Sequence, residues 1–168
     1  EVTGPATERL FALADSPGKM SRLSEERIEK AIFPAGFFRT KAKAIRKTSQ
    51  DLVERFGSRV PDTIEELLTL PGVGRKTANL VVTLAHNKAG ICVDTHVHRI
   101  TNRWGYVKTK TPRETEQALR AKLPKKHWIA INTILVMHGQ NICKPLSPLC
   151  SRCPAFKYCA RVGVTKSR

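Results

Sequence analysis

The stretch that decides the fold is LPGVGRKTAN at residues 70–79, which is followed shortly by VDTH at residues 93–96. Proline and two glycines predict a tight turn, because glycine tolerates positive φ and lets the backbone approach a ligand closely. From Arg75 onward the chain has no breaker and carries apolar side chains at helical spacing, which predicts a helix that opens directly after the turn. Backbone N–H groups at such a helix start suit a phosphate.

The remaining sequence predicts further helices and no strands, so the expected fold class is all-α. Ser24, Asp94 and Thr111 each precede an amphipathic run and are expected to be N-caps, while Gly57 is expected to end a helix. Thr111 is followed by Pro at the first helical position and Glu at the third, the pattern of a capping box. Apolar spacing predicts helices over residues 5–14, 24–32, 40–56, 62–70, 75–86, 94–104, 111–123 and 125–139.

The chain is strongly basic, with 30 Lys and Arg residues against 14 Asp and Glu and a net charge of +16 over 168 residues. The basic residues are spread along the chain, which indicates a folded basic surface that favours polyanions such as nucleic acid; a merely solvated surface is the alternative. No apolar run reaches the roughly 20 residues that span a bilayer. Clustered cysteines without an export signal indicate metal binding in a reducing compartment, so we expect a cytoplasmic protein with no membrane partner.

Lys76 lies directly behind the glycine turn and is the first candidate for chemistry. A lysine amine can form a Schiff base, and the positive end of the helix together with Arg75 disfavours its charged form. A lysine behind a glycine turn is also how phosphate sites are built, and most surface lysines have no special role. The residues alone leave these three interpretations open.

Asp94 is the second candidate. It stands where an N-cap is expected, and a carboxylate near an amine can also stabilise a developing positive charge and move protons. Lys76 and Asp94 are separated by one helix and a loop, so the two side chains can meet.

Four cysteines near the C-terminus give the most specific pattern, C-x6-C-x2-C-x5-C. Four thiolates in one short loop can hold a structural Zn²⁺ ion or a [4Fe–4S] cluster, and their spacing alone does not choose between them. Cys92 lies outside this set and is expected to be buried. The set consists of Cys143, Cys150, Cys153 and Cys159.

These motifs together resemble the endonuclease III family of helix-hairpin-helix DNA repair glycosylases, whose members carry L-P-G-V-G-x-K-T-A, then V-D-T-H, then cysteines at this spacing. The resemblance implies a bifunctional DNA glycosylase and AP lyase that excises oxidised pyrimidines and nicks the strand by β-elimination. It implies Lys76 as the Schiff-base nucleophile and Asp94 as its catalytic partner. It also implies that the four cysteines bind a [4Fe–4S] cluster with a structural role.

The resemblance further implies two lobes, with DNA lying across the cleft between them. We expect residues 1–88 to form a helical barrel-like lobe that ends in the helix-hairpin-helix, and residues 89–168 to form a second helical lobe with the iron–sulfur loop. The family has about two more helices before the point where this chain starts, so we expect a truncated N-terminus. The expected partner is double-stranded DNA with damaged bases or abasic sites, bound by a monomer in a prokaryotic cytoplasm close to the nucleoid.

Several residues are expected to bind DNA, beginning with the turn itself at Gly72, Val73, Gly74 and Arg75. Phe37 follows Gly36 in a loop flanked by cations; core packing is its default role, but the matching loop of the family carries an apolar residue that is wedged into the duplex beside the extruded nucleotide. Lys144 is the one cation between Cys143 and Cys150, where the family often has several, so phosphate contact by this loop is expected to be weak.

Two rival functions remain from the sequence. A mismatch-specific glycosylase could use the same scaffold, although the mismatch branches tend to carry another residue at the position of Lys76. A non-catalytic DNA-binding module could use the hairpin and the basic surface only to bind phosphates.

Overall fold

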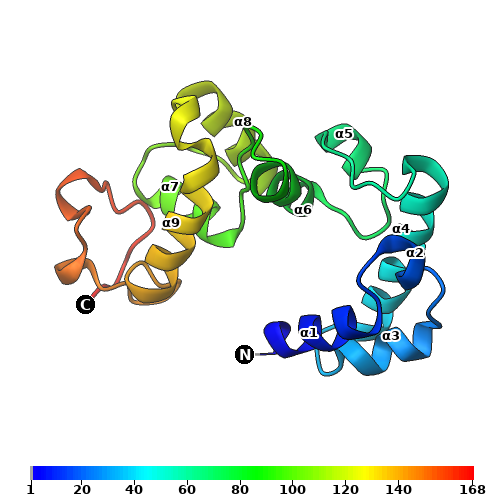
Figure 1. Ribbon diagram of the computed structural model, residues 1–168. Helices are drawn as coiled ribbons and strands as arrows, with labels where there is room; N and C mark the ends of the chain where they lie inside the picture. The colour runs from blue at the N-terminus through cyan, green and yellow to red at the C-terminus, as the bar shows by residue number, and fades with distance from the viewer. Residues whose placement is uncertain (1) are drawn as a thin grey trace. The chain divides into compact units, whose positions relative to one another are not determined.

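The computed structural model describes residues 2–168 (Figure 1), and every regular element in that part of the chain is a helix, as the sequence predicts. Contacts between residues divide the chain into two compact units, Glu1–Gly74 and Arg75–Arg168. No helix among residues 2–168 is long and apolar enough to cross a membrane.

The first unit is a group of short helices packed around the long helix α4. Its core lies between α1, α3 and α4, and Met20 of α2 and Leu23 of the following turn also pack into it. The helices of this unit are α1 (Thr3–Leu13), α2 (Pro17–Met20), α3 (Glu25–Ile32), α4 (Phe38–Phe56) and α5 (Ile64–Leu67). The buried core residues are Leu10, Ala14, Met20, Leu23, Ile28, Ala31, Ile32 and Ala42.

Local signals explain most of the helix ends in the first unit. The Ser24 hydroxyl accepts a hydrogen bond from the Arg27 N–H, as expected of an N-cap. Gly57 ends α4 in the left-handed conformation, with φ +57°, which glycine adopts without strain. The helix expected over 62–70 is shorter, because Thr63 is its N-cap and Pro71 disfavours helical backbone at the residue before it.

The second unit packs α7, α8 and α9 around a larger apolar core. Its elements are α6 (Arg75–Leu80), a π-helical turn η1 (Val81–Ala85), α7 (Thr95–Arg103), α8 (Pro112–Lys122), the 3₁₀ turn η2 (Lys125–His127), α9 (Trp128–Asn141), and two further 3₁₀ turns, η3 (Cys150–Arg152) and η4 (Phe156–Tyr158). The buried core residues are Ile91, Val93, Val97, Ile100, Val107, Leu119, Trp128, Ile131, Leu135 and Cys143.

Two helices of the second unit begin where the sequence predicts. The Oδ1 atom of Asp94 accepts hydrogen bonds from the N–H groups of His96 and Val97, both at 2.9 Å, and so caps α7. Thr111 caps the start of α8 as expected, with the Glu114 N–H donating to its hydroxyl. The Glu114 carboxylate accepts from the Lys110 N–H, one residue before the position that a complete capping box uses.

The helix expected over 75–86 is regular only as far as Leu80. Beyond it the backbone widens into the π-helical turn η1, where the Thr83 hydroxyl donates to the carbonyls of Asn79 and Leu80. A hydroxyl that bonds back into its own helix competes with the regular backbone ladder and often distorts it. Periodicity of apolar residues cannot reveal this change of helix type.

Helix α9 continues past Gly139, where the sequence predicts its end. Gly139 has a packing role instead, because a Cβ atom built there would lie 2.2 Å from Nδ1 of His96 on α7. The absence of a side chain at this position therefore lets the two helices pack closely.

The division at Gly74 lies upstream of the lobe boundary predicted at residue 88. Helix α6 belongs with the second unit because Arg75 and Asn79 are bonded to Glu116 and Ile91. Lys76 and Asp94 consequently lie in the same compact unit.

Candidate active site

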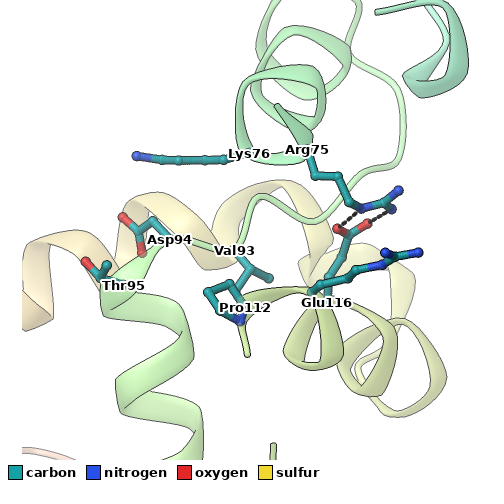
Figure 2. A pocket seen from close by; sticks show the side chains of 8 residues that line it. Arg75, Lys76, Val93, Asp94, Thr95, Pro112 and Glu116 are labelled. Carbon is teal, nitrogen blue, oxygen red and sulfur yellow. Dashed lines mark hydrogen bonds and ion pairs between the residues drawn. The ribbon is translucent and has the colours of Figure 1, made fainter. Parts of the chain in front are cut away.

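A pocket of about 470 Å³ in the second unit brings the two predicted catalytic residues together. Lys76 contributes from the first turn of α6 and Asp94 from the N-cap of α7, and Figure 2 shows both side chains on the same side of the pocket. A volume in this range accommodates a small organic group such as a sugar with its base. The lining residues are Arg75, Lys76, Val93, Asp94, Thr95, Pro112, Arg113 and Glu116.

The Lys76 side chain is exposed and extends into open space above Asp94 (Figure 2). Its backbone is fixed, since its carbonyl accepts a bond from the Cys92 thiol at 3.7 Å. Among residues 2–168, no group accepts a hydrogen bond or forms an ion pair with its Nζ atom, unlike the neighbouring Arg75. The amine is therefore held by its helix and left available to a ligand.

The geometry of Asp94 is compatible with both roles that the sequence left open. Its Oδ1 atom caps α7, which anchors the carboxylate by two backbone N–H groups. The Oδ2 atom accepts no hydrogen bond from any residue in the described part of the chain. One oxygen of the carboxylate thus holds the helix start while the other can face a reacting group in the pocket.

Arg75 points away from Lys76 and Asp94 and is bound to Glu116 of α8 (Figure 2). Its Nε and Nη2 atoms donate to the two carboxylate oxygens of Glu116 at 2.9 and 2.7 Å, a bidentate ion pair. Burial by itself would raise the pKa of Glu116, but hydrogen bonds from Arg75 and Arg120 outweigh it and leave the pKa below its usual value. The arginine that was expected to bind DNA is thus engaged within the protein, and its DNA contact stays a prediction.

All four C-terminal cysteines line one small cavity of about 20 Å³ in the second unit. Cys143 is buried at the end of α9, whereas the other three are half-buried on the irregular segment that follows. Burial raises the pKa of the Cys153 thiol, and charge on the other three sulfurs would raise it further. Among residues 2–168 no group of three or more Cys, His, Asp or Glu side chains is arranged to hold a single metal ion.

Donors surround the sulfurs. The Nη1 atom of Arg103 lies 3.5 Å from the Cys143 sulfur, and the backbone N–H of Arg161 lies 3.4 Å from the Cys159 sulfur. Nε2 of His138 lies 3.7 Å from the Cys153 sulfur. Thiolates that bind a metal cluster are negatively charged, and N–H groups placed in this way stabilise such sulfurs.

Comparison with known proteins agrees with this geometry. The sequence model of the HhH-GPD superfamily of base excision DNA repair proteins matches residues 1–125. Endonuclease III of Thermotoga maritima is 47% identical over 159 residues, which cover 95% of this chain and 75% of the Thermotoga protein. A chloroplastic endonuclease III homologue of Arabidopsis thaliana is 44% identical, covering 94% of this chain and 43% of the plant protein.

A solved structure of a trapped endonuclease III–DNA covalent intermediate superimposes with a TM-score of 0.87 at 36% identity, covering 93% of this chain and 74% of that one. The chain belongs to the endonuclease III family. Enzymes of this family are DNA glycosylases and AP lyases of base excision repair that act on oxidised pyrimidines.

The glycine turn of this endonuclease III family member lies at the end of the first unit. Gly72 adopts φ +75°, and a Cβ atom there would lie 2.9 Å from Cβ of Ala44, so only glycine fits this turn. Gly74 is exposed with nothing within 4 Å of its Cβ position, and Val73 is half-buried. Their DNA contacts stay a prediction.

Phe37 is not part of a core. Its side chain is 86% exposed, and its backbone adopts φ +57°, which is unusual for a residue with a side chain. The neighbouring Phe38 does the packing, with its ring 5.4 Å from that of Phe33 and the Arg39 guanidinium 4.7 Å above it. The sequence left Phe37 open to either role, and in the structure its neighbour Phe38 has the packing role.

Sequence reasoning missed Glu116 and Asn79. The signal for Glu116 was present, because it lies on the apolar side of α8 next to Thr115 and one turn before Arg120, and a carboxylate in such a place needs a cationic partner. Asn79 is the last residue of the stretch 70–79, but nothing in the neighbouring sequence distinguishes it from a surface residue.

Proposed function

We propose that this chain is a bifunctional DNA glycosylase and AP lyase in which Lys76 is the nucleophile and Asp94 its partner. The observation that supports this assignment best is the pocket of the second unit, in which an unpartnered lysine amine and a carboxylate with one free oxygen lie together. Membership of the endonuclease III family makes oxidised pyrimidines in double-stranded DNA the proposed substrate.

In the proposed reaction the neutral Lys76 amine attacks C1′ of the damaged nucleotide and the C1′–N bond to the base breaks. Asp94 stabilises the positive charge that develops on the sugar, and the base leaves with the bonding electrons and a proton. A proton carried from solvent by Asp94 reaches O4′, and the sugar ring opens to an iminium in which the nitrogen of Lys76 is bonded to C1′.

The iminium then acidifies the proton at C2′. Loss of that proton to a base expels the 3′ phosphate oxygen with the C3′–O bond electrons, which is β-elimination. Water hydrolyses the remaining imine and returns Lys76 as a free amine. Asp94 is placed to carry protons in these steps, since its Oδ2 atom is not bonded by other residues of the described chain.

Borohydride trapping on a duplex with an abasic site tests the assignment directly, because hydride reduces the imine to a stable covalent adduct. We expect an adduct with the parent protein, none with Lys76→Ala, and an unchanged yield with Lys126→Ala, which removes an exposed lysine of η2. A parent protein that binds the duplex but forms no adduct would contradict the enzyme assignment and support a DNA-binding module. A panel of lesion duplexes then tests the preference for oxidised pyrimidines over mismatches.

We propose further that Cys143, Cys150, Cys153 and Cys159 bind a [4Fe–4S] cluster. The four thiols line one cavity, and the family to which the chain belongs typically carries such a cluster on four cysteines, which supports a [4Fe–4S] cluster over Zn²⁺. When bound, the cluster would serve as a structural cross-link. Analysis of the purified protein should find iron and acid-labile sulfide in equal amounts, and zinc in their place would contradict the proposal.

Phe37 and Lys144 are proposed as DNA contacts. An exposed aromatic ring at the start of α4, close in sequence to Arg39 and Lys41, suits a wedge that stacks into the duplex beside an extruded nucleotide. Phe37→Ala should leave thermal stability nearly unchanged and weaken binding to abasic-site DNA, whereas the same change at the packed Phe38 should lower stability. We also place the protein in the cytoplasm and expect it to act as a monomer.

A further inference from the structure

The Glu116 carboxylate is the centre of a buried polar network in the second unit. Its side chain is 4% exposed, and its oxygens accept bonds from Nε and Nη2 of Arg75 and from Nε of Arg120, at 2.7 to 3.0 Å. Arg75 is 41 residues away in sequence, so the network joins the first residue of α6 to the middle of α8.

Asn79 extends the network from α6 to the segment that leads into Asp94. Its Nδ2 atom donates to the Arg75 carbonyl at 3.0 Å, and its Oδ1 atom accepts from Nη2 of Arg120 and from the N–H of Ile91, both at 3.1 Å. The segment can come this close because residue 90 is glycine; a Cβ atom there would lie 3.1 Å from Oδ1 of Asn79.

The two ends of this network lie close in sequence to the two proposed catalytic residues. Arg75 precedes Lys76 directly, and Ile91 lies three residues before Asp94 on a buried segment. The same segment contacts Lys76 through the Cys92 thiol, which donates to the Lys76 carbonyl. It contacts α9 through the Cys92 carbonyl, which accepts a hydrogen bond from Asn132. Burial raises the pKa of the Cys92 thiol to about 11. The thiol therefore stays protonated and remains a donor.

We propose that Glu116 is a positioning residue of the reaction, which acts through Arg75, Arg120 and Asn79 to fix the Lys76 amine at its working distance from Asp94. The proposal rests on the proposed function above. A bidentate Arg–carboxylate pair has a fixed geometry, and a buried one is hard to rearrange. A displacement of about 1 Å between reacting groups can lower a rate by about a hundredfold.

Asp51 provides a matched control. It is also a buried carboxylate held by two cations, Lys47 at 2.9 Å and Arg55 at 3.7 Å, but all three residues lie on α4 and touch neither catalytic residue. Asp51→Asn and Glu116→Gln each remove one buried negative charge and keep the size of the side chain. The two variants should therefore differ in catalysis much more than in stability.

The test measures the single-turnover rate of borohydride-trapped adduct formation at saturating protein, together with the melting temperature and the affinity for a duplex with a reduced, uncleavable abasic site. Glu116→Gln should form the adduct at least about tenfold more slowly, with affinity changed by no more than about twofold. Asp51→Asn should keep the parent rate. Hydrogen exchange at the amides of residues 90–94 should rise in Glu116→Gln and not in Asp51→Asn.

Arg120→Lys gives a milder version if Glu116→Gln does not fold, because it keeps the charge but loses the second bond, to Asn79. It should slow adduct formation in the same direction by a smaller factor. If the parent protein forms an adduct, and Glu116→Gln and Asp51→Asn form it at equal rates, this inference alone is overturned. A parent that forms no adduct overturns the proposed function and this inference together.

Discussion

Two regions of the second unit are held in place by different means. The site region, Arg75–Asn141, contains nearly the whole apolar core of its unit and the buried network around Glu116. The cysteine segment, Lys144–Arg168, has only 3₁₀ turns as regular structure, and Pro148 is its one buried residue. The site region can thus be organised by protein contacts alone, whereas the cysteine segment has too little buried surface to order itself.

Arg103 is the main link between these two regions. Its guanidinium donates to the carbonyls of Lys144 and Pro145 at 2.7 and 2.6 Å, and its own carbonyl accepts from the Val162 N–H at 3.0 Å. These bonds fasten the start and the end of the cysteine segment to α7 but leave its middle to the four sulfurs. One region is therefore preorganised by protein contacts, and under the proposed function the other depends on the group that its cysteines bind.

The largest expected effect lies in the site region, with Asp94→Asn. Asparagine caps a helix as well as aspartate does, so the melting temperature should change little. Loss of the negative charge should slow release of a damaged base by about a hundredfold, since charge stabilisation and proton transfer contribute on this scale. Single-turnover excision and equilibrium binding measure the two effects, and equal losses in both would indicate a positioning role for Asp94.

Removing one sulfur should act on the other region. In Cys153→Ser the amides of residues 144–168 should exchange about tenfold faster or more, while those of the site region keep most of their protection. Cys92→Ser is the control, since it removes a cysteine of the site region and should leave exchange in the cysteine segment unchanged. Hydrogen exchange followed by mass spectrometry measures both, and uniform loss of protection in Cys153→Ser would show that the regions are not independent.

Low pH should reduce the folding stability of the site region through protonation of Glu116. The pKa of its carboxyl is lowered in the folded protein, so below its ordinary value of 4.5 the unfolded chain takes up the proton first and the folded state loses stability. Glutamine does not titrate. The melting temperature of the parent should exceed that of Glu116→Gln at neutral pH, and this difference should shrink as the pH falls below 4.5; a constant difference would contradict the ion pair. Other carboxyls with lowered pKa values are common to both proteins and cancel.

The smallest effect is expected from Lys144→Ala at the start of the cysteine segment. Its side chain is exposed, and its bonds are made by the backbone, whose N–H donates to the Ile142 carbonyl and whose carbonyl accepts from Arg103. Loss of one phosphate contact should weaken binding to all duplexes alike and reduce the slope of log affinity against log salt by about one. Lys166→Ala, another exposed cation of the segment, should leave the slope as it is, and an unchanged slope in Lys144→Ala would remove this residue from the DNA interface.

What the sequence could predict was local. The cap at Asp94, the cap at Thr111 and the helix end at Gly57 each depend on residues within four positions of one another, and all three are confirmed. The resemblance of the motifs predicted membership of the endonuclease III family, and the comparisons confirm it. The pairing of Arg75 with Glu116 could not be predicted, because it joins residues far apart in sequence.

The same limit applies to the close packing of α7 against α9. A glycine near a helix end predicts a stop, and only the three-dimensional arrangement reveals His96 beside it. The meeting of Lys76 and Asp94 was expected from two motifs, but the pocket wall at Pro112 and Arg113 was not, since a helix-start pattern does not say what lies against it.

The contact at Gly139 has a consequence for anyone who wishes to make this protein more robust. Replacing an interior helix glycine by alanine is a standard way to raise thermal tolerance, since alanine restricts the unfolded chain. Here the added methyl group would collide with the imidazole of the V-D-T-H motif and push apart the helix that begins at Asp94 and the helix that ends beside Cys143. Gly139→Ala, although it follows a common stabilising strategy, would thus disturb both the candidate active site and the cysteine loop.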